Sequence, residues 1–254
     1  MIKKLLIAIS VICLGLSLFL YTRPTKLTTV INKSVKIDKE VQKFSKNTKR
    51  TKENETPQNL NWDEINSEYN DVIAWIKIPG TSIDYPILQG SDNSYYLNHN
   101  YKNQKDILGS IFIDYRQEKN FNNFNTIIYG HNVLNESSDV KFTELNNYLK
   151  QDFFDKHKNV YIFTPERVIV GKVFASQTSD KSSGANNVTI KNKEEFNSYL
   201  SKIKQKSAIV GDVDYTKIEK TITLWTCTMQ STVNSKGNFV PATKARTFVS
   251  VSLK

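Results

Sequence analysis

The stretch Thr221-Ile-Thr-Leu-Trp-Thr226, followed at once by Cys227, decides our expectation for both the fold and the chemistry of this chain. β-Branched and aromatic side chains favour a strand, and the cysteine stands where that strand ends. A second run of the same kind, Arg246-Thr-Phe-Val-Ser-Val-Ser-Leu253, begins 19 positions after the cysteine. Hairpin-like pairing of the two runs would bring Arg246 near Cys227.

Six further runs rich in Val, Ile, Phe, Tyr and Thr precede these two, which makes eight expected strands. The six are residues 72–78, 82–88, 110–114, 125–130, 160–164 and 168–176. Helical patterns are found at residues 61–69, 142–149 and 193–204. The third of these carries an apolar helical face made of Phe196, Tyr199, Leu200 and Ile203. Many short strands with few helices predict a mainly β fold, a closed or nearly closed eight-stranded β-barrel.

The net charge of +10 is concentrated in the N-terminal part. Residues 1–50 hold 11 of the 35 Lys and Arg residues but only 2 of the 25 Asp and Glu residues, which leaves 24 basic and 23 acidic residues beyond. The folded part is therefore nearly neutral. The basic segment suits anionic phospholipid or a cell-wall polymer, and no recognition motif accompanies it, so we expect no nucleic-acid binding.

The N-terminus is expected to anchor the chain in a membrane. Residues 5–21 are uninterruptedly apolar and would reach roughly 25 Å as a helix, and the following Leu20-Tyr-Thr-Arg-Pro24 offers no small-x-small cleavage site. We therefore expect a short cytoplasmic tail at residues 1–4, a transmembrane signal anchor at 5–21, a basic helical stalk and linker at 22–59, and a catalytic domain at 60–254. The basic residues after the anchor outnumber the two lysines before it, so the positive-inside rule alone opposes an extracytoplasmic domain.

Outside the apolar stretch the chain has one cysteine, Cys227. A lone cysteine is more often buried and inert, but the polar Thr228-Met-Gln-Ser-Thr232 after it favours an exposed strand end. His131 has the same setting, since a buried type of strand and Gly130 precede it and a polar loop follows. A neighbouring imidazole raises the thiolate share of a thiol whose ordinary pKa is near 8.5. Cys227 and His131 are thus a candidate acyl-transfer pair, with a buried cysteine and a surface histidine as the alternative.

Acyl transfer also requires fixed donors or a cation for the oxyanion. The chain uses lysine heavily but has only five arginines, Arg23, Arg50, Arg116, Arg167 and Arg246. Arg246 is the candidate because it opens the strand expected beside Cys227, although an arginine at a surface edge strand is the alternative. No cofactor is expected, and no metal, because two cysteines and three histidines without ligand spacing make no zinc site.

A resemblance to a known family joins these features. The matching segments, in chain order, are Val72-Ile-Ala-Trp-Ile-Lys-Ile-Pro-Gly-Thr-Ser-Ile-Asp-Tyr-Pro-Ile87, Asp92-Asn-Ser-Tyr-Tyr-Leu97, Gly109-Ser-Ile-Phe-Ile-Asp114, Asn125-Thr-Ile-Ile-Tyr-Gly-His131, Thr223-Leu-Trp-Thr-Cys227 and Arg246. From about Asn61 to Leu253 the chain resembles class B sortases, the surface-protein transpeptidases of Gram-positive bacteria. The resemblance implies an eight-stranded sortase barrel with N-terminal helices and a helix between strands six and seven, for which residues 193–204 are the candidate.

The resemblance also implies the reaction and its partners. The Cys227 thiolate would attack the bond after Thr in a C-terminal sorting signal of a surface protein, of LPxTG-like or NPxTN-like type. His131 would protonate the leaving amine, and Arg246 would hold the carbonyl oxygen or the substrate backbone. The amine of a peptidoglycan precursor would then resolve the acyl-enzyme. The implied location is the cell membrane, with one membrane span and an extracytoplasmic catalytic domain.

Four residues are candidates for substrate binding. The resemblance maps Asn93 and Leu97 to the substrate side, with a helix N-cap and a core leucine as the alternative reading. Trp225 and Thr226 lie beside the nucleophile, and Trp225 replaces the small residue that the family pattern suggests, which would reshape the groove. No acidic residue follows the cysteine, so a third acidic member is in doubt, with Asp114 and Asp212 as weak substitutes.

Two other functions use the same residues. A membrane-anchored cysteine endopeptidase would release its acyl-enzyme to water with the same pair. A non-catalytic wall-binding module would keep Cys227 and His131 as structural residues only.

Overall fold

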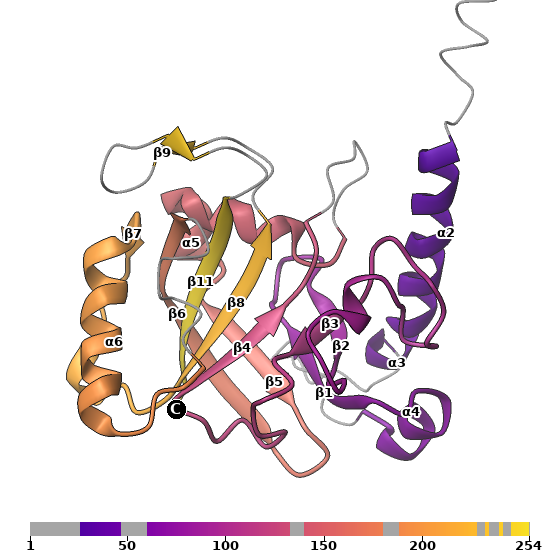
Figure 1. Ribbon diagram of the computed structural model, residues 1–254, viewed down its shortest axis with the longest axis horizontal. Coiled ribbons are helices and arrows are strands. Elements are labelled where there is room, and N and C mark those ends of the chain that lie inside the picture. Colours follow the sequence, from indigo (N-terminus) through magenta and orange to yellow (C-terminus); the bar gives the residue numbers. More distant parts are fainter. Residues whose placement is uncertain are drawn as a thin grey trace, which may run out of the picture.

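A β-barrel with helices along its sides forms the centre of the molecule (Figure 1). The computed structural model describes residues 26–46, 60–132, 140–179, 188–227, 232–233, 239–240 and 245–253. All eight expected strands are present in this part of the chain. They are β1 (Val72–Lys77), β2 (Asp84–Leu88), β3 (Ile111–Ile113), β4 (Asn125–Tyr129), β5 (Asn159–Phe163), β6 (Val168–Ser179), β8 (Thr221–Cys227) and β11 (Arg246–Leu253).

The eight strands close on themselves. They follow the order β11-β8-β4-β3-β2-β1-β5-β6, and β11 pairs with β6 as well as with β8. Two pairs, β2 with β3 and β4 with β8, are parallel, and the other pairs of the ring are antiparallel. Closure leaves no strand of the ring with a free edge, which fixes the register of β8 from both sides. The predicted eight-stranded barrel is confirmed.

Three short strands were not predicted. The strand β7 (Ile209–Val210) adds to β6, while β9 (Thr232–Val233) pairs with β10 (Phe239–Val240) in a separate two-stranded sheet. Each has two residues, which is too short for an alternating pattern to identify. The sheet formed by β9 and β10 belongs to the connection between β8 and β11.

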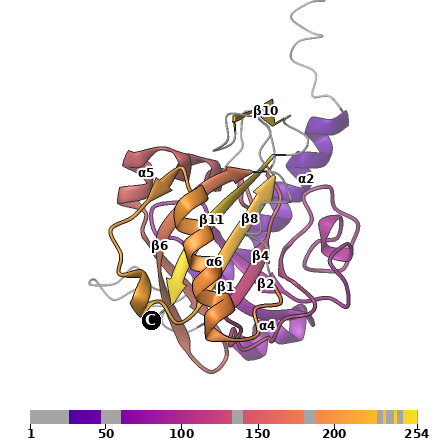
Figure 2. The same ribbon diagram turned by 60° about the vertical axis from the view of Figure 1, so that its left-hand side comes forward.

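Helices cover the outside of the barrel. The helix α6 (Lys193–Lys206) begins after Asn192, whose side chain accepts from the Glu195 amide at 2.9 Å. It lies over β8 and β11 (Figure 2), where its four predicted apolar residues are buried against Phe174 and Phe248. The predicted helix between the sixth and seventh strands of the barrel is therefore present.

The other helices that follow residue 60 are short. Two short α-helices are present, α4 (Trp62–Glu68) and α5 (Gln151–Lys156). There are also three 3₁₀ helices, η1 (Tyr95–Leu97), η2 (Thr143–Leu149) and η4 (Tyr215–Lys217). The helical pattern expected at residues 142–149 is thus a 3₁₀ helix. Its tight i to i+3 bonding starts with the Leu145 amide donating to the Phe142 carbonyl at 3.1 Å.

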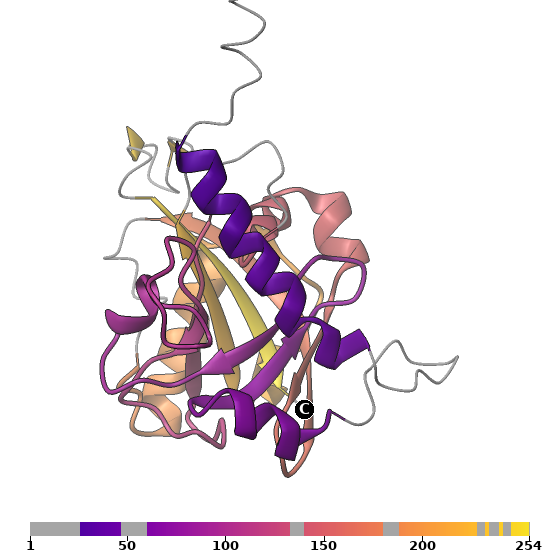
Figure 3. The ribbon, with the colours of Figure 1, turned by 90° about the vertical axis from the view of Figure 1, so that its right-hand side faces the viewer.

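An N-terminal helix pair lies along the side of the barrel (Figure 3). It consists of α2 (Lys26–Val41) and α3 (Lys43–Lys46), where the sequence predicts an amphipathic helix. Val41 is buried in the main core, and the Ser45 hydroxyl donates to Asp84 at 2.8 Å. Among the described residues, no helix has the length and apolar character needed to cross a bilayer, and the expected anchor at residues 5–21 lies outside them.

One glycine is required by the packing of η1 against the strand that follows it. Gly109 has φ +52°, and a Cβ atom there would collide with the Tyr96 carbonyl oxygen and come within 2.7 Å of the Leu97 carbonyl oxygen. Both obstacles are backbone atoms, which do not yield easily.

We predict that Gly109→Ala lowers the free energy of unfolding by roughly 2 to 4 kcal/mol, because a left-handed conformation and a backbone collision act together. Chemical denaturation measures this change. The matched control is Gly211→Ala, where the new Cβ would meet the Phe154 ring at 3.3 Å. Equal stability of the two variants would contradict the prediction.

Candidate active site

The ends of β8 and β11 place two of the predicted residues opposite each other. In the antiparallel register of these strands, Cys227 pairs with Arg246 and Trp225 pairs with Phe248. The predicted hairpin-like pairing is therefore confirmed at the level of the backbone. The Arg246 side chain is partly exposed, and its Nη1 donates to the Ala245 carbonyl at 2.8 Å.

The end of β4 lies on the other side of β8. In this parallel pair Tyr129 is opposite Trp225, and the Gly130 amide donates to the Trp225 carbonyl at 3.1 Å. His131 follows directly, so it emerges beside the end of β8. Three neighbouring strands thus end with His131, Cys227 and Arg246 in one row across the barrel mouth.

The His131 ring is held by a backbone carbonyl. Its Nε2 lies 2.6 Å from the Leu97 carbonyl oxygen. Because a carbonyl can only accept, Nε2 carries the hydrogen, and in the neutral ring Nδ1 is the nitrogen that can take up a proton. Burial lowers the pKa of His131 below its ordinary value, the bond to Leu97 opposes this shift, and the Lys141 charge adds to it.

Phe142 is packed tightly against the end of β4. The Phe142 amide donates to the His131 carbonyl at 3.0 Å, and a Cβ atom on Gly130 would come within 2.6 Å of the Phe142 ring. Gly130 is therefore needed because it makes room for Phe142. The hydrogen bond and the ring contact together hold Gly130 and His131 against Phe142.

Aromatic rings form the floor beside the row. The Trp225 ring lies 5.0 Å from that of Tyr129 and 5.3 Å from that of Phe248, measured between centroids. Such tilted contacts are favourable for aromatic pairs. The large side chain at position 225 is therefore accommodated by packing against the Tyr129 ring and the buried Phe248 ring.

A buried carboxylate supports one wall of the site. Asp114 has no exposed side-chain surface and accepts from Arg116 Nη2 at 2.7 Å, Asn93 Nδ2 at 2.7 Å and Tyr129 Oη at 2.9 Å. Burial alone would raise the pKa of Asp114, but these hydrogen bonds, those of Arg116 first, hold it below its ordinary value. The carboxylate is therefore ionised at neutral pH and fixes Asn93 and Tyr129 in place.

These elements surround a cavity of about 410 Å³. It is lined by Asn93, Leu97, Phe112, Tyr129, Gly130, His131, Trp225, Thr226 and Arg246. All four residues expected on the substrate side lie in this lining. Leu97 is exposed, whereas Thr226 is buried and its hydroxyl oxygen has no hydrogen-bond partner among the residues that the structure describes.

The sequence did not identify the partner of His131. Asp114, considered as a third acidic member, bonds with Asn93, Tyr129 and Arg116, and His131 contacts the Leu97 carbonyl instead. The other two histidines are also bound to carbonyls, His99 to that of Tyr95 at 2.8 Å and His157 to that of Pro79 at 3.0 Å. Within the described residues, no group of three or more His, Cys, Asp and Glu side chains could hold a metal ion.

Comparisons with known proteins agree with this arrangement. A family model described as a sortase domain matches residues 76–245. The chain is 34% identical to sortase B of Staphylococcus aureus over 186 residues, which cover 73% of this chain and 74% of that protein. It is 39% identical to sortase B of Listeria monocytogenes over 160 residues, which cover 62% of this chain and 63% of that one. A solved Staphylococcus aureus sortase B–substrate complex is similar at a TM-score of 0.70 and 26% identity, covering 89% of this chain and 98% of that one.

We predict that His131 makes stability depend on pH. The pKa of His131 is lower in the folded chain than in the unfolded chain. When the pH falls through about 6.5, His131 therefore binds a proton in the unfolded chain first, which favours unfolding. Acidification from about pH 7.5 to about pH 5 should therefore cost the natural chain more stability than it costs His131→Gln. Denaturant titrations at both pH values measure this, and identical losses in the two proteins would contradict it.

We further predict that Asp114→Asn lowers the free energy of unfolding by about 2 kcal/mol or more, because three donors lose an ionised acceptor. Thermal or chemical denaturation measures the loss. Asp155→Asn is the control, since its pair with Lys158 is exposed and screened by solvent, so its removal should change stability little. A loss at Asp114 no larger than that of the control would contradict the supporting role of this carboxylate.

Proposed function

The chain belongs to the sortase family, within its class B, and from that premise we propose which bond it cleaves and which residues carry out the reaction. Sortases are cysteine transpeptidases, and this chain is an enzyme of that type. We propose that it cleaves a C-terminal sorting signal of surface proteins after Thr and transfers the acyl group to the amine of a cell-wall precursor. The observation that carries the proposal is the row formed by His131, Cys227 and Arg246 at the ends of three adjacent strands.

In the first half of the reaction Cys227 is the nucleophile. Its thiolate attacks the carbonyl carbon of the Thr residue, and the C–N bond breaks to leave a thioester. As the thiolate forms, the neutral His131 ring takes up the proton of the Cys227 thiol, and it then passes this proton to the leaving amine. Nδ1 is the atom that delivers it, because the Leu97 carbonyl occupies Nε2. This arrangement supports a Cys-His pair without a carboxylate partner for the histidine.

The second half restores the enzyme. The acceptor amine attacks the thioester, the C–S bond breaks, and Nδ1 of His131 takes the proton that the amine loses. The thiolate is thereby released with an amide as product. The lowered pKa of His131 supports its role as a base, since the ring is largely neutral at neutral pH.

Arg246 is proposed to stabilise the oxyanion or hold the substrate backbone. Its place opposite Cys227 and its share in the lining of the cavity support this role. A planar guanidinium can donate two parallel hydrogen bonds, which suits a carbonyl oxygen and a neighbouring backbone group better than an ammonium does.

The wall residues are proposed to bind the sorting signal. Leu97 and Trp225 offer apolar surface, while Asn93, which is fixed by Asp114, offers an amide. Thr226 adds a hydroxyl oxygen without a partner. A signal of LPxTG-like or NPxTN-like type combines apolar and polar residues in this way, and a peptidoglycan precursor is the proposed acceptor.

The proposed location is the cell membrane. Residues 5–21 would be the signal anchor and residues 60–254 the extracytoplasmic catalytic domain. The apolar length of the first range supports the anchor, and the extracytoplasmic side is proposed from the reaction on surface proteins.

We predict that Cys227→Ala and His131→Ala each lower the rate of peptide cleavage by about three orders of magnitude or more, because nucleophile and proton carrier act as a unit. Arg246→Lys should lower it by about ten- to a hundredfold, since a point charge does not reproduce a planar fork. The control is Arg167→Lys, where an exposed side chain donates to the Asn120 carbonyl. Full cleavage by Cys227→Ala would refute the proposal.

The assay uses fluorogenic peptides with each type of signal, with and without a short glycine peptide as amine acceptor. Mass spectrometry of the products distinguishes the two reactions. Transpeptidation predicts a new amide with the acceptor. Purely hydrolytic products at saturating acceptor would favour the endopeptidase instead.

A further inference from the structure

A lysine is buried beside the candidate site, next to the loop that carries His131. The Lys141 side chain is 1% exposed, and its Nζ lies 2.5 Å from Asp38 Oδ1 on α2 and 2.6 Å from the Tyr101 hydroxyl. The ammonium also faces the Tyr101 and Tyr85 rings, at 4.3 and 5.2 Å from their centroids. A buried charge is tolerated only when it is paired, and Asp38 supplies the neutralising charge.

The backbone of the same lysine is in an unfavourable conformation. Lys141 has φ +53°, a backbone angle that residues other than glycine rarely adopt. Its amide donates to the Tyr85 hydroxyl at 3.1 Å. The ion pair at one end and this hydrogen bond at the other therefore hold a residue that would otherwise relax.

The held conformation is transmitted to His131 through one residue. Phe142 follows Lys141, donates its amide to the His131 carbonyl at 3.0 Å, and packs its ring against Gly130. If Lys141 moved, Phe142 would move with it, so the His131 carbonyl would lose its hydrogen bond and Gly130 would lose its packing partner. Shifts of about 1 Å in such groups are enough to reduce catalysis strongly.

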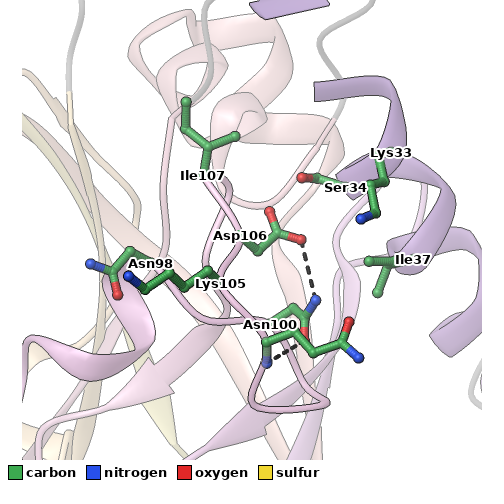
Figure 4. A pocket seen from close by; sticks show the side chains of 9 residues that line it. Lys33, Ser34, Ile37, Asn98, Asn100, Lys105, Asp106 and Ile107 are labelled. Atoms are coloured by element: carbon green, nitrogen blue, oxygen red, sulfur yellow. Dashed lines mark hydrogen bonds between the residues drawn. The ribbon is translucent and has the colours of Figure 1, made fainter. Parts of the chain in front are cut away.

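Two cavities flank the ion pair of Asp38 between α2 and the rest of the molecule. A cavity of about 430 Å³ separates Lys33, Ser34 and Ile37 of α2 from the loop of residues 98–107 (Figure 4). On the far wall, Asn100 and Asp106 are bonded to each other at 3.5 Å. A second cavity of about 500 Å³, which Asp38 itself lines, separates α2 from the turn before β2. The ion pair therefore adds a polar attachment to the apolar contacts of α2, which are those of Val35 with Leu108 and Val140 and that of Val41 in the main core.

We propose that Asp38 is a positioning residue for His131, acting from the N-terminal helix through Lys141 and Phe142. The inference rests on the catalytic role proposed for His131. It makes α2 part of the catalytic apparatus, because loss of the Asp38 carboxylate would free Lys141 and shift Phe142, which contacts His131. The same loss would leave the Lys141 charge unbalanced, and that charge already acts on the His131 ring.

The test combines a spectroscopic readout with kinetics. The chain has three histidines, so labelled histidine gives three ring signals in NMR spectra, and His131→Asn identifies the one from His131. Asp38→Asn should shift the His131 signal and leave those of His99 and His157 in place. It should also lower kcat for peptide transfer about tenfold or more with little change in KM, and Asp38→Glu should restore part of the rate.

The matched control is Glu40→Gln on the same helix. Its carboxylate pairs with Lys102 at 3.9 Å, and both side chains are largely exposed. This variant should change neither the His131 signal nor kcat. An equal effect of Glu40→Gln and Asp38→Asn would overturn the inference.

A second variant covers the case in which Asp38→Asn does not fold. Asp38→Leu combined with Lys141→Met replaces both charges by apolar groups, which leaves no unpaired buried charge. The inference predicts a folded protein with a shifted His131 signal and a reduced kcat. A natural His131 signal with natural kcat in this variant would refute the coupling. The NMR signal needs no substrate, so it tests the coupling separately from the reaction. If the natural protein transferred no peptide while the variant still shifted the His131 signal, the proposed function would be refuted and the coupling would stand.

Discussion

The pairing of β8 with β4 on one side and β11 on the other is the constraint on which the rest of the site depends. The register of β8 with its two neighbours decides which backbone positions lie opposite each other, so a slip of one residue in either pair would move Cys227 from its place opposite Arg246 and beside the strand end that leads to His131. Closure of the barrel through β11 and β6 prevents such a slip, because β11 is held from both sides. The chemistry at the barrel mouth is thus set by hydrogen bonds that run along the whole length of the strands.

Two buried charges hold the walls of the site. Asp114 fixes the wall that carries Asn93, and Lys141 holds the loop that carries His131. Each is satisfied by several partners, which offsets the cost of removing it from water. The Asp114 carboxylate therefore positions the neutral side chains of Asn93 and Tyr129. The His131 ring is itself held by the Leu97 carbonyl.

The strands and the residues of the central row could be predicted from the sequence, because β-branched runs alternate clearly and the chain has few cysteines and histidines. The partner of His131 could not, since every residue offers a carbonyl and no side chain marks the position of Leu97. Asp114 was considered only as an acid for the histidine, and its true partners come from three different segments. The helical stalk expected within residues 22–59 is present as α2, but the sequence does not show which surface a helix covers, so the role of Asp38 could not be predicted. The use of Gly130 to admit the Phe142 ring depends on a contact across 12 residues of chain, which no local signal contains.

The most direct test of the account is the mass of the intact protein after rapid quenching with a sorting peptide and no acceptor amine. The account predicts a covalent adduct that equals the acyl part of the peptide, is removed by hydroxylamine, and maps to the fragment that contains Cys227. In the Arg246→Lys protein the adduct should form more slowly at the same position. Turnover of the peptide with no adduct on Cys227, or with an adduct on another residue, would contradict the central claim that these three strand ends form one acyl-transfer site.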